Sequence, residues 1–446
     1  MSVRRALCLR AASVVNSPAM ATNGKEGRAV GPLQLLALGL NGIVGVGIFF
    51  VPATVAAGAP GLGGVLVFLA TGLALLPAAF AFAILGRRFD EDGGPVVFAR
   101  AAFGPGVAFL VGWVAYVSGF FSLAAVVVGL VNATAPACGL TGAMPRRAAA
   151  VLLVLALALV VASGLRLSAR LWTSLTALKL VPLLLLLGAL AVGFASLPPP
   201  APPVVSRSWL AAGLAVMFSF QGFEVVPVIA GQVRSSFRAI PMATVGSLGL
   251  AIVLYCALAL ACVLALPALA SSSAPLADAA GVLGGSGLAR LVAAGTSVSA
   301  LGIAFAMTVT TPRYLSALAA GEHHLLDLDR YSSRGVPLRA LAVTAVVAAG
   351  LVGAQELGEL FALSSIAVLM QYGVSAAALL VLAWRRQRGL VPPDAWPALP
   401  TLLVGVVLVR YGATLREAAT ALGAVAVGLL LLWLATRRRQ PAGPRG

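Results

Sequence analysis

Apolar runs of about 18 residues or more recur along almost the whole chain, and each is long enough to cross a membrane as a helix. Of the 446 residues, 61% are hydrophobic and only 10% are charged. Soluble domains average about 25% charged residues. Too little polar surface remains to cover a water-soluble core. The sequence therefore predicts an all-α polytopic membrane protein.

We predict about twelve transmembrane helices, because polar or proline-rich stretches divide the apolar runs into that many segments. The predicted spans cover residues 33–58, 62–86, 105–133, 148–163, 172–196, 209–231, 242–266, 285–312, 337–354, 359–384, 396–411 and 417–436. Residues 271–285, rich in small side chains, are expected to form a loop. Residues 1–30 and 437–446 are expected to be cytoplasmic tails, the first of them disordered.

Basic residues in the loops predict the orientation, because cytoplasmic loops are enriched in Lys and Arg. With the N-terminus inside, only six basic residues fall outside: Arg146, Arg147, Arg207, Arg290, Arg410 and Arg416. Both termini are therefore expected in the cytoplasm, with the spans in the cell (cytoplasmic) membrane. The net charge of +17 reflects this loop pattern. The chain has no basic module interleaved with aromatic residues, so nucleic acid is not an expected partner.

Two ionisable residues fall deep within predicted spans, where each costs about 2.5–3.5 kcal/mol even on the milder scales. Glu224 is the only one of the 13 acids placed in this way, and Lys179 is the only such basic residue. Residues of this kind usually mark a substrate or proton path. The alternative for Lys179 is a side chain that reaches the membrane interface from near a helix end.

The first predicted span contains Gly42, Gly45 and Gly47, and each glycine destabilises a helix by roughly 1 kcal/mol relative to alanine. Close helix packing through small residues is one interpretation, but it explains poorly the two glycines that flank Val46. A helix break would expose backbone groups, which membranes tolerate only where the break lines a cavity. Its N–H groups would suit a carboxylate and its carbonyls an ammonium group, so the break fits a zwitterion.

The sixth predicted span has a counterpart, where Gly222 lies between Gln221 and Glu224. Interruptions five spans apart are typical of two inverted five-helix repeats with the binding site between them. A plain kink at Pro227 is the alternative. We therefore predict repeats at residues 31–196 and 205–390, followed by two additional helices at 396–436.

These stretches resemble the amino acid–polyamine–organocation superfamily of secondary transporters, in particular bacterial amino acid permeases. Residues 42–49, GIVGVGIF, are similar to the first-span motif, and residues 88–95 to the second loop with its double glycine. Residues 230–241 resemble the loop after the sixth span, and residues 312–321 the end of the eighth. The resemblance covers residues 31–390.

The resemblance implies five helices plus five in inverted topology, two extra C-terminal helices, and a substrate between the broken first and sixth helices. Amides near Val46, Gly47 and Ile48 would hold the carboxylate, and carbonyls of both breaks would hold the amine. Phe218 would close over the substrate as an aromatic gate. The implied substrate-binding residues are Ile43, Val44, Gly45, Val46, Gly47, Ile48, Phe218, Ser219, Phe220, Gln221 and Gly222.

Lys179 resembles a fifth-span lysine that takes the place of a bound sodium ion in proton-coupled relatives. A lysine withdrawn from water can exchange its proton near neutral pH, so Lys179 is the expected proton-coupling residue. Three positions depart from the pattern of the family. Gln232 stands where many relatives have an acid, and Ser236 where many have proline. Val46 stands where serine or alanine is common, which rules out a hydroxyl contact to the substrate there.

The expected function is secondary active transport of an amino acid by alternating access, with the proton as coupling ion. An exchanger or exporter would share every motif, and a permease-like receptor or scaffold is the non-transport alternative. The sequence has no HExxH motif, no paired inward carboxylates and no nucleophile–histidine pair, so an enzyme is not expected. The two histidines, His323 and His324, lie in a polar loop, and no metal or cofactor is expected.

Val46 and three aromatic residues, Phe218, Phe220 and Phe223, favour a substrate with an apolar or neutral side chain. Glu224 would instead attract a cationic one. Tyr116 and Tyr372 either reach the site or pack within the bundle. Hydroxyls of the eighth span, on Thr296, Ser297 and Ser299, either lie beside Lys179 or support helix packing.

Overall fold

The computed structural model describes residues 32–89, 91, 93–164, 169–194, 197, 199, 208–233, 236–320 and 327–437, and the regular elements in these ranges are all helical. Eight helices are long and apolar enough to cross a membrane, and the bent pair α2 (Pro32–Ile43) and α3 (Gly47–Gly58) makes a ninth span. Three shorter apolar helices bring the described part to the predicted twelve. The expected tail at residues 1–30, both histidines, and all but the first residue of the expected tail at 437–446 lie outside the described residues. Arg437 is instead the last residue of the final helix.

The helix boundaries generally lie within a few residues of the predicted ones. After α3 the helices are α4 (Leu62–Gly86), α5 (Pro95–Phe103), α6 (Pro105–Thr134), α7 (Ala143–Ala162), α8 (Ala169–Gly193), α9 (Ser208–Phe220), η2 (Phe223–Gln232), α10 (Ser236–Ala265), η3 (Leu269–Ser271), α11 (Pro275–Ala320), α12 (Leu338–Ala354), α13 (Leu357–Trp384), η4 (Gln387–Gly389), η5 (Pro392–Ala395), α14 (Ala398–Gly412) and α15 (Leu415–Arg437).

The predicted loop at residues 271–285 is wrong over most of its length. Helix α11 already begins at Pro275, because proline lacks an N–H and has a fixed φ that suits the first helical turn. Leu276 and Ala279 are fully buried in the main core, so the small residues pack rather than form a loop. The helix changes direction at Gly285, whose φ of 77° favours glycine.

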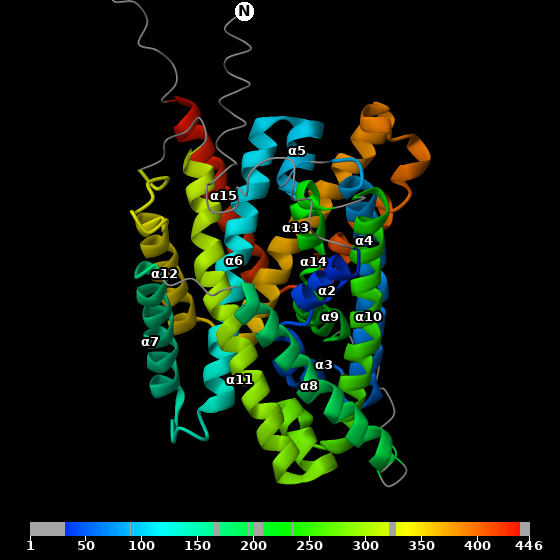
Figure 1. Ribbon diagram of the computed structural model, residues 1–446, viewed down its shortest axis with the longest axis vertical. Coiled ribbons are helices and arrows are strands. Elements are labelled where there is room, and N and C mark those ends of the chain that lie inside the picture. Colours follow the sequence, from blue (N-terminus) through cyan, green and yellow to red (C-terminus); the bar gives the residue numbers. More distant parts are fainter. Residues whose placement is uncertain are drawn as a thin grey trace, which may run out of the picture.

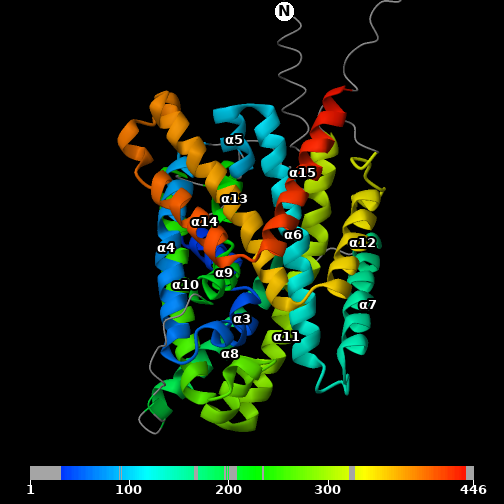
Figure 2. The ribbon, with the colours of Figure 1, turned by 180° about the vertical axis from the view of Figure 1, so that it is seen from behind.

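Spans that are five apart in sequence pack against each other: α3 against α9, α4 against α10, α6 against α11, and α7 against α12. In both ribbon views α7 and α12 lie together at one edge of the bundle, away from α4 and α10 (Figures 1 and 2). Helices α2, α3 and α9 lie between these edges. Such pairing is what two repeats of five helices would produce, and the division at residues 31–196 and 205–390 stays a prediction.

The last two helices attach to the outside of this arrangement. Trp113 in α6 donates a hydrogen bond from its indole nitrogen to the carbonyl of Ala424 in α15, over 2.7 Å. Much of the remaining surface of these helices is exposed leucine, including Leu403 and Leu430. An apolar outer surface of this kind is what a span requires where it faces lipid.

Candidate functional site

The first span is broken at the predicted glycines. Helix α2 ends at Ile43 and α3 begins at Gly47, with a bend of 44° between them. The N–H of Val44 still donates to the helix carbonyl of Leu40 over 2.7 Å. The N–H of Gly45 turns back to the carbonyl of Ile43 over 2.6 Å, which ends the helical pattern.

The start of α3 offers three backbone donors. In the part of the chain that the structure describes, no acceptor meets the N–H groups of Val46, Gly47 and Ile48. The side chains of Val46 and Ile48 are buried, so these N–H groups lie inside the protein. A helix N-terminus with unpaired N–H groups carries a partial positive charge, which suits an anion such as a carboxylate.

The sixth span breaks between α9 and the 3₁₀ helix η2. Gly222 connects them with a φ of 128°, which strongly favours glycine over other residues. Pro227 lies within η2, after the break, so a plain proline kink does not account for the interruption. The carbonyls that end α9 lack the intrahelical donors that earlier carbonyls have, and so offer acceptors.

The two breaks are in direct backbone contact. A Cβ atom added to Gly42 would lie 3.1 Å from the carbonyl oxygen of Gly222. A Cβ atom added to Gly47 would lie 2.6 Å from the Cα of Ser219, which is too close for any real side chain. Glycine is therefore required at these positions for the two broken spans to cross. The crossing brings the start of α3 against the end of α9.

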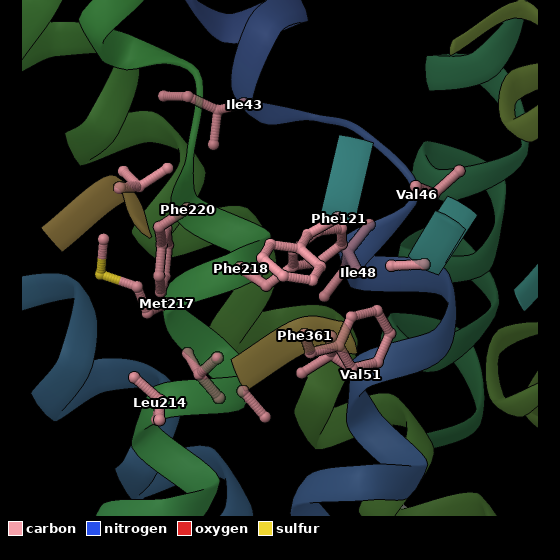
Figure 3. Packing of buried hydrophobic residues seen from close by; sticks show 14 of the residues in the cluster. Ile43, Val46, Ile48, Val51, Phe121, Leu214, Met217, Phe218, Phe220 and Phe361 are labelled. Atoms are coloured by element: carbon pink, nitrogen blue, oxygen red, sulfur yellow. The ribbon is translucent and has the colours of Figure 1, made fainter. Parts of the chain in front are cut away.

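Aromatic rings fill the space beside this crossing. Figure 3 shows Phe218, Phe121 and Ile48 gathered beside the start of α3, with Phe361 close by. The rings of Phe218 and Phe361 have centroids 4.6 Å apart, and Phe218 is 7% exposed. Phe220 instead packs against Tyr255, with centroids 5.2 Å apart.

Two small apolar cavities lie elsewhere in the bundle. One is lined by residues of α6, α13 and α15, and the other by residues of α3, α4, α10 and Leu269. Neither is lined by a residue of the Val44–Val46 break or of the α9–η2 break. The first cavity reaches Phe121, one of the rings beside the crossing.

Lys179 lies at the end of α2, although it belongs to α8. Its Nζ donates a hydrogen bond to the backbone carbonyl of Asn41 over 3.0 Å, and the residue is 6% exposed. A lysine that reached the membrane interface would not be buried in this way. Tyr255 of α10 donates from its hydroxyl to the carbonyl of Ile43 over 2.7 Å. The carbonyls of Asn41 and Ile43, close to the first break, thus each accept a hydrogen bond from a side chain of another helix.

Glu224 lies just after the second break and is bonded from two sides. One carboxylate oxygen accepts the backbone N–H of Gly222 over 2.7 Å and the hydroxyl of Tyr372 over 2.8 Å. The acid therefore ties the break to α13. Tyr116 does not join this group, because its hydroxyl pairs with Thr344 of α12 at 3.3 Å.

A third polar group surrounds Gln221. Its Oε1 accepts the hydroxyl of Ser364 over 3.2 Å, and its Nε2 donates to Ser365 over 3.4 Å. The hydroxyl of Ser122 lies 2.7 Å from that of Ser364. We name Gln221, Ser122, Ser364 and Ser365 the serine–glutamine cluster.

The hydroxyls of α11 do not form such a cluster. Thr296 and Ser297 donate to carbonyls four residues earlier in their own helix. Ser299 is buried, and its hydroxyl has no partner among the described residues. The helix-packing interpretation therefore suits Thr296 and Ser297.

Sequence reasoning missed Tyr255, Ser364 and Ser365. A tyrosine in mid-span is a usable signal, because a buried hydroxyl almost always needs a hydrogen-bond partner. Two adjacent serines in mid-span are another such signal. Neither pattern names the partner, which in each case lies more than 140 residues away in sequence.

Comparisons with known proteins match a permease family and several transporters over most of the chain. The family model described as "Amino acid permease" matches residues 30–428. An uncharacterized transporter of Mycobacterium tuberculosis (strain ATCC 25618 / H37Rv) is 30% identical over 415 residues, which cover 90% of each chain. The methylthioribose transporter of Bacillus subtilis (strain 168) is 26% identical over 377 residues, 80% of this chain and 81% of that protein. Cationic amino acid transporter 4 of Mus musculus is 28% identical over 389 residues, 80% of this chain and 60% of that protein.

Proposed function

We propose a function from one premise: the chain belongs to the amino acid permease family and is a transporter of that family. Within it, we propose that the substrate is an α-amino acid, moved across the cytoplasmic membrane by alternating access and coupled to protons. Substrate-binding roles would fall to residues of the two breaks, 43–48 and 218–222.

The observation that carries this proposal is the crossing of the two broken helices. The unpaired N–H groups of Val46, Gly47 and Ile48 suit a carboxylate, and the carbonyls that end α9 suit an ammonium group. These groups lie together because Gly47 packs directly on Ser219. A zwitterion presents both charges within one small molecule, so an α-amino acid fits the pair of helix ends.

Proton coupling is proposed for Lys179. Its ammonium group bonds to the carbonyl of Asn41, two residues before the end of α2. Gain of the proton would form that bond, and loss of the proton would weaken it. The charge of the lysine would thus favour one position of α2 over another. Access to the site would then depend on whether the lysine is charged.

Counterflow in liposomes tests the substrate class. The purified full chain is reconstituted with an unlabelled amino acid inside, and entry of the labelled amino acid is followed. We expect entry to be blocked by free amino acids but not by their methyl esters or N-acetyl derivatives, because each derivative removes one of the two charges. Equal competition by the esters would overturn backbone recognition at the crossing.

A further inference from the structure

We propose that the substrate carries a neutral polar side chain, a hydroxyl or a carboxamide, and that the serine–glutamine cluster recognises it. The inference rests on the proposed function and narrows its substrate class. It differs from the apolar side chain that the aromatic residues near Gly222 suggest.

The cluster joins α6 and α13, which carry two of the rings beside the crossing, to the break that follows α9, the helix with the third ring. Ser122 follows Phe121 in α6, and Ser364 lies one turn after Phe361 in α13. Gln221 adjoins Gly222 at the break itself. Figure 3 shows Phe121, Phe218 and Phe361 gathered beside the start of α3. Ser364 shares a face of α13 with Phe361, because residues three apart in a helix are neighbours, and Ser122 and Gln221 both bond to Ser364, so the cluster lies next to these rings.

The hydrogen-bond directions within the cluster follow from the carboxamide. An amide oxygen can only accept, so Ser364 must donate to Gln221, and Ser122 must then donate to Ser364. The amide nitrogen can only donate, so Ser365 receives its bond from Gln221. The hydrogen of the Ser365 hydroxyl and the second N–H of Gln221 are left to donate elsewhere.

A third donor lies close by. Ser219 is almost completely buried at 1% exposure, and its hydroxyl has no partner among the described residues. A buried hydroxyl without a partner is unfavourable, so Ser219, two residues before Gln221, is available to bond a group of the substrate. A hydroxyl or carboxamide on the substrate would accept from these donors, and a hydrocarbon side chain would not.

Buried hydroxyls that only support helix packing have different hydrogen-bond partners from those of the cluster. Thr296, Thr308 and Thr344 each donate to the carbonyl four residues earlier in their own helix. The serines of the cluster make no such bond and instead meet across α6, the α9–η2 break and α13. A cationic side chain is not favoured either, because it can only donate hydrogen bonds and the groups left free in the cluster are donors.

Threonine and valine provide the sharpest test, because they have nearly the same shape and differ by a hydroxyl in place of a methyl group. Counterflow is measured for both, together with glutamine, leucine and arginine, using the reconstituted full chain. We expect threonine and glutamine to be carried in preference to valine, leucine and arginine. Ser365→Ala is expected to lower the threonine-to-valine ratio about fivefold, as the loss of one hydrogen bond would.

Ser316→Ala is the matched control, since Ser316 is a buried α11 hydroxyl without a partner among the described residues. It should leave the ratio unchanged. If the wild-type protein carried valine at the same rate as threonine, the inference would be overturned, while the proposed function would stand. Uptake of methylthioribose without any amino acid would overturn both. The wild-type ratio decides the matter even if a variant does not fold.

Discussion

The Nζ of Lys179 donates a hydrogen bond to the backbone carbonyl of Asn41 over 3.0 Å, which ties α8 to the end of α2 just before the first helix break. No side chain in the described part of the protein forms an ion pair with this ammonium group. The bond therefore depends on the proton of the lysine and on the position of α2. This relationship places a titratable group directly on the part of the chain that alternating access would have to move.

Lys179→Ala is expected to abolish substrate-driven proton flux, reducing it to the level of empty liposomes, because the group that gains and loses the proton is gone. Lys179→Arg should also lose the flux, since arginine stays charged at any relevant pH. Proton entry is followed with a pH-sensitive dye trapped in the liposomes. Lys25→Ala, at the only other lysine, is the control. Unchanged coupling in Lys179→Ala would rule out the proposed role.

Gly47→Ala tests the crossing of the two helices. The added methyl carbon would lie 2.6 Å from the Cα of Ser219, so the two backbones would have to separate. Overpacking of this kind costs typically 1–3 kcal/mol. We expect a lower unfolding temperature and loss of substrate binding, measured by thermal shift with and without an amino acid.

Gly302→Ala is the matched control for that change. Gly302 lies within α11, and a Cβ atom there would meet nothing within 4 Å. Alanine should be neutral or stabilise the helix by about 0.4–1 kcal/mol. If Gly47→Ala behaved like Gly302→Ala, the close contact between α3 and α9 would not be important for the site.

The sequence predicts the spans well, because a membrane helix must be apolar over its whole length. Helix α4 covers residues 62–86, as predicted. The first break was also predictable, since Gly42, Gly45 and Gly47 disfavour a helix on their own. The stretch before Gly285 was misjudged because small residues serve both loops and closely packed helices. Composition alone does not separate the two.

The polar contacts of the site were not predictable in the same way. Glu224 stands out in sequence as a charge in a span, but nothing in its neighbours indicates Tyr372. Similarly, Gln221 gives no sign that Ser364 and Ser365 surround its side chain. Such contacts depend on how α9 and α13 pack, and helix packing is set by many weak contacts along both helices.

Cys138 offers a direct test of orientation. It is exposed and follows the end of α6, whereas Cys262 is buried and Cys256 is only partly exposed. The ribbon views place the α6–α7 connection at the end of the bundle opposite α5 and the end of α15 (Figures 1 and 2). The distribution of basic residues favours the α5 end as cytoplasmic.

The test uses a Cys8→Ser background, because Cys8 is the remaining cysteine of the sequence and would also react. In that background a membrane-impermeant maleimide should label Cys138 in intact cells, detected as a mass shift of the purified protein. Cys138→Ser should abolish the shift. Labelling that occurs only after the membrane is permeabilised would reverse the orientation. The reversed result would place the α5 end of the bundle on the outer face.

Phe218 and Phe361 join the second break to α13 through rings 4.6 Å apart. Phe218→Ala is expected to weaken amino acid binding about tenfold, because loss of a ring that covers the crossing also removes up to about 1.5 kcal/mol of aromatic pairing. Phe361→Ala should act in the same direction. Since both changes break one stack, the loss of binding free energy in the double variant should be smaller than the sum of the two single losses by about 0.5–1.5 kcal/mol. Binding is measured by competition in counterflow, with Phe80→Ala as the control. The rings of Phe80 and Trp396 have centroids 5.2 Å apart, so Phe80→Ala removes a comparable aromatic contact elsewhere in the bundle. Strictly additive effects of the two changes would show that each ring acts alone and that the stack does not close the site.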